Sequence, residues 1–194
     1  MYRVTRDSVK LLTKILFGLE VIGHENILES DGAIIAANHV SFYDPIVVAS
    51  AIKRPVHFMA KAELFKSLIP GWFLRQINVF PVRRGVADRN AIRQAINLVK
   101  NKKLLGIFPE GTRNRSDDSL PLQGGASLIA IKTGAPIIPV VVTGTNGLRL
   151  RKKISVYIGE PIQVSEGKKV SREEISDLNL VISDQFAVLG KQES

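Results

Sequence analysis

Short apolar runs rich in valine and isoleucine alternate with helical patterns along most of the chain. This alternation is typical of an α/β domain with a mostly parallel central sheet flanked by helices. The runs expected to form strands are 19–22, 33–37, 56–59, 78–80, 104–108, 137–142 and 154–158. The segments expected to form helices are 45–52, 87–101 and 126–132, and Ser171 and Glu174 have capping-box spacing for a final helix. We predict one domain over residues 18–194.

The first 17 residues show a different pattern. Residues 2–16 favour an amphipathic helix, with Leu11 and Leu12 on the apolar face and Lys10 and Lys14 on the basic face. Such a helix either packs on the core or lies on an anionic membrane surface, and we expect an interfacial helix over residues 1–17. No apolar run approaches the ~20 residues that a membrane-spanning helix needs, so no transmembrane segment is expected.

Composition limits which kinds of partner and which kinds of catalytic or metal site the chain can have. Lys and Arg outnumber Asp and Glu by 27 to 18, a net charge of +9, which predicts attraction to nucleic acid, an acidic carrier protein, phosphate substrates or anionic lipid. Cysteine is absent, which excludes disulfides, thiolate metal sites and a cysteine nucleophile on this chain. His24 and His57 lack the spacing of metal ligands, so we expect no catalytic metal.

The candidate catalytic residues follow the apolar run at 33–37. His39 comes directly after it, where the carboxyl ends of strands face the ligand crevice of an α/β sheet. On one helix, residues five apart point about 140° away from each other, so a turn must bring Asp44 to His39. Pro45 favours that turn, because proline prefers the first helical position and Asp is a strong N-cap. The Asp44 carboxylate can then accept the Nδ1 proton of His39, which leaves Nε2 as a general base. The alternative is that Asp44 only caps the helix.

Two further strand ends carry groups suited to phosphate. Glycine lets the backbone approach a ligand closely, and hydroxyl and guanidinium groups donate hydrogen bonds to phosphate. Groups of these kinds follow two of the predicted strands. The run at 104–108 is followed by Gly111, Thr112 and Arg113, and the run at 78–80 by Arg83 and Arg84. Either segment taken alone is also compatible with an ordinary surface loop. Together, three strand ends bring a base and phosphate-binding groups toward one region.

These segments resemble the four sequence blocks of the glycerophospholipid acyltransferase family, most closely its bacterial 1-acylglycerol-3-phosphate branch. The first block is His, four residues, then Asp, and the third is Phe-Pro-Glu-Gly-Thr-Arg. The blocks occur in family order at 38–44, 80–84, 108–113 and 135–140, with weaker similarity at 21–27 and 60–64. One block alone would be weak support, whereas four in order are specific.

The resemblance implies a reaction and a phosphate site. A fatty acyl group would pass directly from a thioester to a hydroxyl, with His39 as general base and Asp44 orienting it, and no cofactor. Ser41 lacks a nucleophile-elbow sequence and is disfavoured as a nucleophile. The acceptor phosphate would be held by Lys61, Arg113 and one of the second-block arginines Arg83 and Arg84, with the alignment favouring Arg84. Gly111 and Thr112 would shape the pocket, and Asn38 and Glu110 would support the site.

Two departures from the family pattern weaken the match locally. Many relatives carry a lysine before the glycine at Gln123-Gly124, and the N-terminal region has room for one surface helix rather than a pair of hydrophobic helices. The segment 65–73 places large apolar residues beside lysine. It fits a core helix, a wall of an acyl-chain pocket, or a second membrane contact.

The expected activity is acylation of the sn-2 hydroxyl of 1-acyl-sn-glycerol 3-phosphate to give phosphatidic acid in phospholipid biosynthesis. The expected partners are a lysophospholipid acceptor, an acyl carrier protein or coenzyme A thioester, and an anionic membrane surface. The protein would be peripheral at the cytoplasmic face of the cell membrane. An enzymatic alternative uses glycerol 3-phosphate or another lysophospholipid as acceptor. A different alternative is a basic nucleic-acid-binding domain, although the sequence carries no RNA- or DNA-binding motif.

Overall fold

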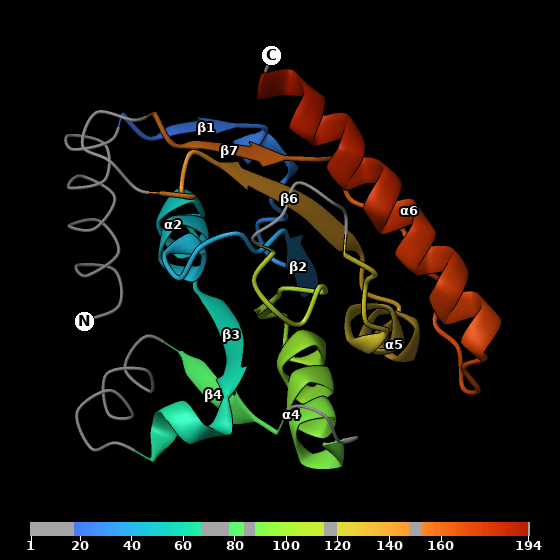
Figure 1. Cartoon of the computed structure of the whole chain (residues 1–194). Helices are drawn as coiled ribbons and strands as arrows, with labels where there is room; N and C mark the ends of the chain where they lie inside the picture. The colour runs from blue at the N-terminus through green and yellow to red at the C-terminus, as the bar shows by residue number, and fades with distance from the viewer. Residues whose placement is uncertain (1–17, 67–77, 84–87, 115–119, 148–152, 194) are drawn as a thin grey trace.

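A computed structural model of the chain describes residues 18–66, 78–83, 88–114, 120–147 and 153–193 (Figure 1). The predicted amphipathic helix at 1–17, the residue Arg84 and all but the first two residues of the segment 65–73 lie outside these ranges. In the described part, no helix is both long enough and apolar enough to cross a bilayer.

The described strands form one sheet in the order β1-β7-β6-β2-β5-β3-β4. They are β1 (Glu20–Ile22), β2 (Ala33–Ala37), β3 (Val56–Lys61), β4 (Val79–Val82), β5 (Leu104–Ile107), β6 (Ile137–Thr143) and β7 (Ser155–Ile158). Strands β6, β2, β5, β3 and β4 are parallel, whereas β7 pairs antiparallel with β6 and β1 follows the direction of β7. The prediction of a mostly parallel α/β sheet is therefore confirmed, with strand ends shifted by at most two residues.

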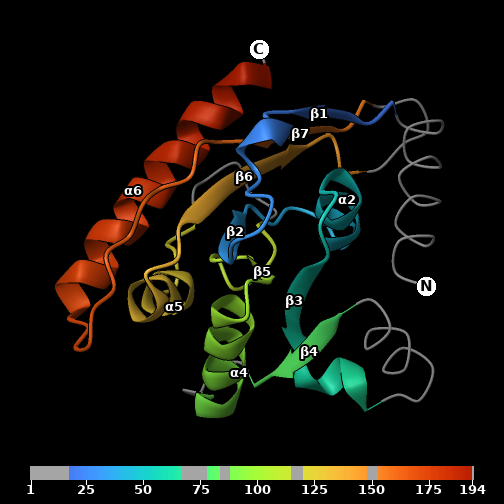
Figure 2. The ribbon, with the colours of Figure 1, turned by 180° about the vertical axis from the view of Figure 1, so that it is seen from behind.

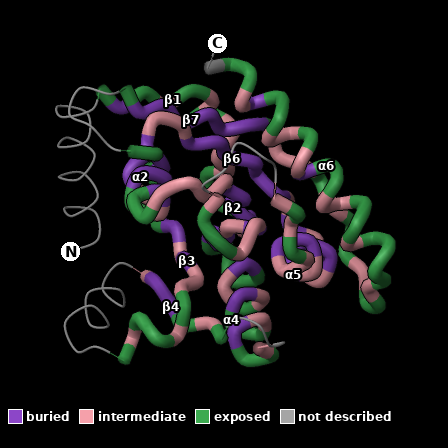
Figure 3. The backbone as a smooth tube through the Cα atoms, viewed as in Figure 1, coloured by how far each residue is buried: buried purple, intermediate pink, exposed green. Residues whose placement is uncertain are grey.

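Helices cover both faces of this sheet (Figures 1 and 2). α2 (Asp44–Ala51) lies on one face, and α4 (Arg89–Lys100), α5 (Gly125–Thr133) and α6 (Arg172–Gly190) lie on the other. Short 3₁₀ helices η1 (His24–Asn26), η2 (Ala62–Phe65) and η3 (Lys191–Glu193) complete the described elements. Figure 3 shows that buried residues concentrate in the strands and on the inner sides of the helices.

The alternation of side chains along β2 divides the core in two. Ile35 packs in a cluster with Val48 of α2, whereas its neighbour Ile34 packs with Ile129 of α5 and Ile182 of α6. All five residues are fully buried. A parallel strand covered on both faces is apolar throughout rather than alternating, which is why the run at 33–37 was recognisable as a strand.

Local capping groups set where α4 and α6, on the second face, begin. Ser171 and Glu174 form the predicted capping box at the start of α6. α4 begins two residues later than predicted because the Asp88 carboxylate accepts hydrogen bonds from the N–H groups of Asn90 and Ala91. A side-chain cap of this kind satisfies N–H groups that have no partner within the helix.

The connections around β2 and β5 determine where a ligand can bind. β2 continues through α2 on one face to β3, and β5 continues through α5 on the other face to β6. These connections leave two neighbouring strands in opposite directions, which makes their carboxyl ends a topological switch point. Open α/β sheets bind ligands at such points. His39 follows β2 there, and Glu110 follows β5.

Candidate active site

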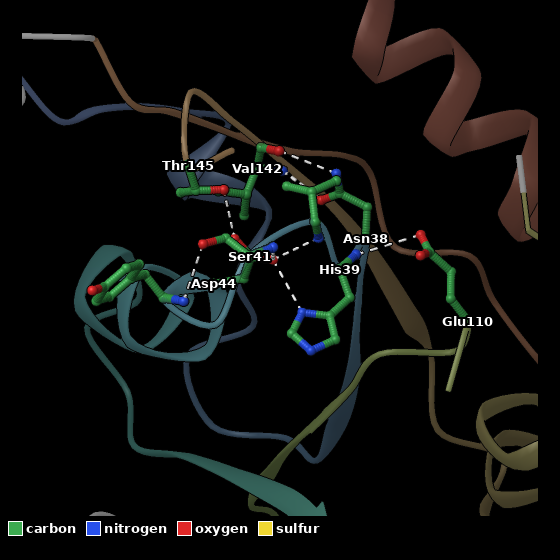
Figure 4. Close-up of polar contacts among 9 residues, drawn as sticks. Asn38, His39, Ser41, Asp44, Glu110, Val142 and Thr145 are labelled. Atoms are coloured by element: carbon green, nitrogen blue, oxygen red, sulfur yellow. Dashed lines mark hydrogen bonds and ion pairs between the residues drawn. The ribbon is translucent and has the colours of Figure 1, made fainter. Parts of the chain in front are cut away.

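His39 and Asp44 meet across the short turn between β2 and α2 (Figure 4). Nδ1 of His39 lies 3.0 Å from Oδ2 of Asp44. Because a carboxylate only accepts hydrogen bonds, Nδ1 carries the hydrogen and Nε2, on the far side of the ring, is left as an acceptor. The His39 side chain is 12% exposed and that of Asp44 is fully buried. The arrangement is that of an imidazole oriented as a general base.

The Asp44 carboxylate is held by the turn itself. Its Oδ2 also accepts hydrogen bonds from the backbone N–H groups of Val40 and Ser41, both at 2.7 Å, and its Oδ1 accepts one from the Thr145 hydroxyl at 2.6 Å. A buried charge is tolerated when it is paired and hydrogen-bonded in this way.

The expectation that Asp44 caps α2 is wrong, because the helix begins at Asp44 with Tyr43 in the cap position and no side-chain cap. The carboxylate points back into the turn instead.

Asn38 fixes the start of the turn to the neighbouring strand. Its side-chain amide donates to the Val142 carbonyl at 3.1 Å and accepts from the Val142 N–H at 2.7 Å, so both backbone groups of one β6 residue are used. Its own N–H donates to the Val140 carbonyl at 3.3 Å. Asn38 thus extends the pairing of β2 with β6 by one residue and holds the backbone from which His39 projects.

Two phenylalanines form a platform under the imidazole. The His39 ring stacks on Phe108 with centroids 4.3 Å apart, and Phe108 in turn stacks on Phe58 at 5.8 Å. Gly106 of β5 makes room for this arrangement, since any side chain at position 106 would overlap the Phe58 ring. The ring of His39 is therefore restrained by its face as well as by its Nδ1 hydrogen bond.

The loop after β5 binds both backbone groups of His39. The His39 N–H donates to Oε1 of Glu110 at 3.4 Å, and the His39 carbonyl accepts from the Asn114 N–H at 2.6 Å. Oε2 of Glu110 is buried and has no hydrogen-bond partner within the described residues. Burial raises the pKa of Glu110, and the hydrogen bond from His39 opposes this only in part. Glu110 thus supports His39 rather than only its own loop.

The remaining third-block residues lie along this loop. Gly111 has a φ of +69°, a conformation that side-chain-bearing residues rarely adopt, and its N–H closes a turn onto the Phe108 carbonyl at 3.0 Å. Thr112 and Arg113 are exposed. Since the next residue, Asn114, is hydrogen-bonded to His39, the structure brings the backbone of Arg113 close to His39.

Lys61 is the last residue of β3, and Arg83 directly follows β4, the neighbouring strand at the edge of the sheet. Lys61 is paired in register with Val82, so Arg83 follows directly beyond it on the same edge of the sheet. The Lys61 side chain is about half exposed, and its ammonium nitrogen lies 3.9 Å from a Glu63 carboxylate oxygen. Arg83 is exposed, donates its N–H to Asp88 at 3.0 Å, and lines a pocket of about 420 Å³ that Lys66 also lines. The structure thus places Lys61 and Arg83 on the edge of the sheet that carries His39.

Thr145 is the site residue that the sequence did not suggest. It is 1% exposed and contacts Asp44 from a position 101 residues away in the chain. It follows β6, whose carboxyl end lies beside that of β2, by way of Gly144. The available clue was the further apolar run at 137–142, since the polar residues after a parallel strand would lie at the same edge of the sheet.

Known proteins are similar to this chain in sequence and in fold. The acyltransferase family model matches residues 18–143. The 1-acyl-sn-glycerol-3-phosphate acyltransferase of Bacillus subtilis is 35% identical over 170 residues, covering 86% of this chain and 84% of that protein. The enzyme of the same name from Escherichia coli K12 is 33% identical over 193 residues, covering 91% and 77%.

A solved structure is similar along nearly the whole chain. The crystal structure of the 1-acyl-sn-glycerophosphate (LPA) acyltransferase from Thermotoga maritima superposes with a TM-score of 0.75 at 28% identity, covering 97% of this chain and 80% of that one. The family match, the identity to the curated relatives and the shared fold agree with one another. The chain therefore belongs to the acyltransferase family.

Proposed function

We propose that this acyltransferase moves a fatty acyl group from a thioester to the sn-2 hydroxyl of 1-acyl-sn-glycerol 3-phosphate. The observation that carries the proposal is the hydrogen bond between His39 Nδ1 and Asp44 Oδ2, which leaves Nε2 free to accept a proton. A thioester is already activated, so the hydroxyl needs a positioned base more than the enzyme needs a nucleophile of its own. The relatives named above acylate the same acceptor according to their names.

The reaction has two proton transfers at one nitrogen. Nε2 of His39 takes the proton from the acceptor hydroxyl as its oxygen attacks the thioester carbonyl, and Asp44 supports the imidazolium that forms. The tetrahedral intermediate then expels the thiolate, the C–S bond breaks, and the imidazolium returns the proton to sulfur. The products are an ester and a free thiol, and the histidine is regenerated.

The cations would hold the acceptor while this happens. Lys61, Arg83 and Arg113 end or follow three neighbouring strands beside His39, and Arg84 continues the second block. Guanidinium groups bind phosphate oxygens through paired hydrogen bonds, and lysine adds a point charge. Gly111 and Thr112 would supply backbone and hydroxyl contacts in the same loop. The donor is an acyl carrier protein or coenzyme A thioester, and the protein would work as a peripheral protein at the cytoplasmic face of the membrane.

Purified protein tests the proposal directly. It would be incubated with a labelled acyl thioester, on either carrier, and a panel of 1-acyl-sn-glycerol 3-phosphate, glycerol 3-phosphate and other lysophospholipids. We expect acylation of 1-acyl-sn-glycerol 3-phosphate at sn-2 and a loss of at least about 10²-fold in kcat for His39→Ala. His24→Ala, at an exposed histidine, is the matched control and should keep full activity. Preference for another acceptor would replace the proposed substrate, and full activity of His39→Ala would remove the mechanism.

A further inference from the structure

The turn that carries the catalytic pair also carries an unusual apolar surface. Phe42, Tyr43 and Ile46 are 64%, 47% and 36% exposed. The described part of the chain has eight exposed large apolar residues, and these three fall within five consecutive positions beside His39. Single exposed apolar residues are ordinary, but a group gathered at a functional site marks a contact surface. We call Phe42, Tyr43 and Ile46 the apolar rim.

The polar contacts beneath the rim hold it outward. Asp44 binds the N–H groups of Val40 and Ser41, and its own N–H donates to the Ser41 carbonyl at 3.4 Å, so the turn is anchored on both sides of Phe42 and Tyr43. The two rings contact only each other among the described aromatic pairs, edge to face with centroids 6.0 Å apart. The turn therefore presents two aromatic side chains to the surroundings from a fixed backbone.

The charges on this edge of the sheet favour an anionic partner. Lys61, Lys66, Arg83 and Arg113 are exposed and lie at or beyond the carboxyl ends of parallel strands, the edge on which the rim also stands. Glu63 is an exposed acid on this edge, while the carboxylates of Asp44 and Glu110 are turned inward. Aromatic side chains next to cations suit the boundary between lipid headgroups and acyl chains, where rings enter the apolar layer and cations meet phosphate.

We infer that the apolar rim enters the surface of an anionic bilayer and brings His39 to the lipid acceptor. This inference rests on the proposed function, because an acceptor with a long acyl chain resides in the membrane. Insertion of Phe42 and Tyr43 next to His39 places the base at the depth of the headgroups, where the acceptor hydroxyl lies. The acceptor then reaches the site without leaving the bilayer.

Labelling tests the contact without relying on activity. Because the chain has no cysteine, Phe42→Cys and Leu180→Cys each accept a polarity-sensitive fluorophore at one position. Leu180 is the matched control, since it is apolar, 62% exposed and on α6, across the sheet from α2. With phosphatidylcholine vesicles containing phosphatidylglycerol, we expect a blue shift at position 42 and none at 180. Equal emission at the two positions would overturn the inference.

A second pair of variants measures the strength of the contact. Phe42→Ser should bind the same vesicles about ten-fold more weakly than the unmodified protein, and the loss should persist at high salt, which screens the cations but not apolar burial. Leu180→Ser should bind normally. Normal vesicle binding by Phe42→Ser with a raised KM for an acyl carrier protein thioester would make the rim a carrier contact. An emission change at position 42 with protein concentration alone would make it a self-association surface.

A short-chain acceptor dissolved as monomers separates this inference from the proposed function. Phe42→Ser should acylate it as fast as the unmodified protein, because the monomer needs no membrane contact. If the unmodified protein fails to acylate it, the proposed function fails while the fluorescence result stands. If both proteins acylate the short-chain acceptor equally but the emission at position 42 does not shift with vesicles, the inferred membrane contact of the rim is overturned and the proposed function stands.

Discussion

The turn that carries His39 and Asp44 and the strand ends that carry Lys61 and Arg83 lie on the same edge of the sheet, yet they are built in opposite ways. Asp44 is fully buried and accepts hydrogen bonds from two backbone N–H groups, one hydroxyl and one imidazole. Lys61 is about half exposed, and its ammonium nitrogen lies 3.9 Å from a carboxylate oxygen of Glu63. One half of the site is fixed by the fold, and the other half consists of long side chains at the surface.

The difference follows from what each half would have to do. A general base must hold its nitrogen within hydrogen-bond reach of one proton, and errors of an ångström are costly, so rigidity contributes to rate. A phosphate group is larger, carries charge on several oxygens and is attracted over distance, so flexible cations can bind it. Changes in the buried half should therefore lower kcat and stability together, whereas changes in the exposed half should act mainly on KM.

Asp44→Asn should show the largest effect. An asparagine amide keeps the size of the side chain but replaces one acceptor oxygen with a donor, so the tautomer and orientation of His39 are no longer enforced. We expect kcat to fall by about 10²- to 10⁴-fold and the free energy of unfolding to fall by about 1–3 kcal/mol. Steady-state kinetics and urea denaturation measure the two, with Asp177→Asn on the exposed side of α6 as control. A large change in KM with unchanged kcat would contradict the proposed role.

Arg113→Ala should act mainly on the KM for the acceptor rather than on kcat or stability. Loss of a guanidinium that binds phosphate should raise the KM for the acceptor by about 10- to 100-fold, because hydrogen bonds to charged groups contribute about 1.5–3 kcal/mol. Stability should stay within about 0.5 kcal/mol, since the residue is exposed. Arg172→Ala, at an exposed cation on α6, should change neither quantity. If Arg113→Ala lowers kcat and leaves KM unchanged, the division between the two halves is wrong.

Local patterns in the sequence predicted much of the rigid half. The strand at 33–37 was predicted with its observed ends because β2 is buried on both faces and stops where Asn38 begins its side-chain contacts. The position of His39 and the fold-back of Asp44 followed from the spacing and from Pro45. Pro45 lies in the first turn of α2 as expected, but the role given to Asp44 as the N-cap was wrong. Its carboxylate accepts hydrogen bonds from the N–H groups of Val40 and Ser41, which precede it, and not from those of the helix.

Contacts between distant segments could not be predicted in the same way. Thr145 meets Asp44 only because β6 pairs with β2, and a single sequence does not give the order of strands in a sheet. The antiparallel direction of β7 and β1 was likewise not specified by their apolar runs, since a buried strand looks alike in either direction. The cations have long, flexible side chains, so the positions of their charged groups depend on the surrounding residues and cannot be predicted from the local sequence.

Thr145→Val tests the distant contact. Valine keeps the shape of threonine but removes the hydroxyl, so Oδ1 of Asp44 loses its partner in a buried place. We expect a fall of about 1–3 kcal/mol in the free energy of unfolding and about ten-fold in kcat, with the KM of both substrates unchanged, because Thr145 would act through Asp44. Thr145→Ser restores the donor and should recover most of kcat. Equal loss in the serine and valine variants would show that packing, and not the hydroxyl, matters.

Glu110→Gln should have the smallest effect and the clearest dependence on pH. Glutamine keeps an oxygen that can accept the His39 N–H, so activity near neutral pH should change by only a few-fold. Stability should respond differently, because burial raises the pKa of Glu110 above its usual value of 4.5. In the unfolded chain this carboxyl loses its proton at a lower pH than in the folded protein. Its contribution to stability is thus complete below pH 4.5 and is lost as pH rises through the raised pKa.

Glutamine does not titrate, so the free energy of unfolding of the wild-type protein minus that of Glu110→Gln should fall as pH rises from about 4 to about 7. Urea denaturation of the two proteins at a series of pH values measures this difference. Asp184→Asn, at an exposed carboxylate on α6, provides the comparison with an exposed group and should give a nearly constant difference. A constant difference for Glu110→Gln as well would mean that Glu110 loses its proton at the same pH in the folded protein as in the unfolded chain, so that it is ionised near neutral pH. In that case the buried half of the site would hold a second carboxylate charge beside Asp44, and the backbone N–H of His39 would have to stabilise that charge.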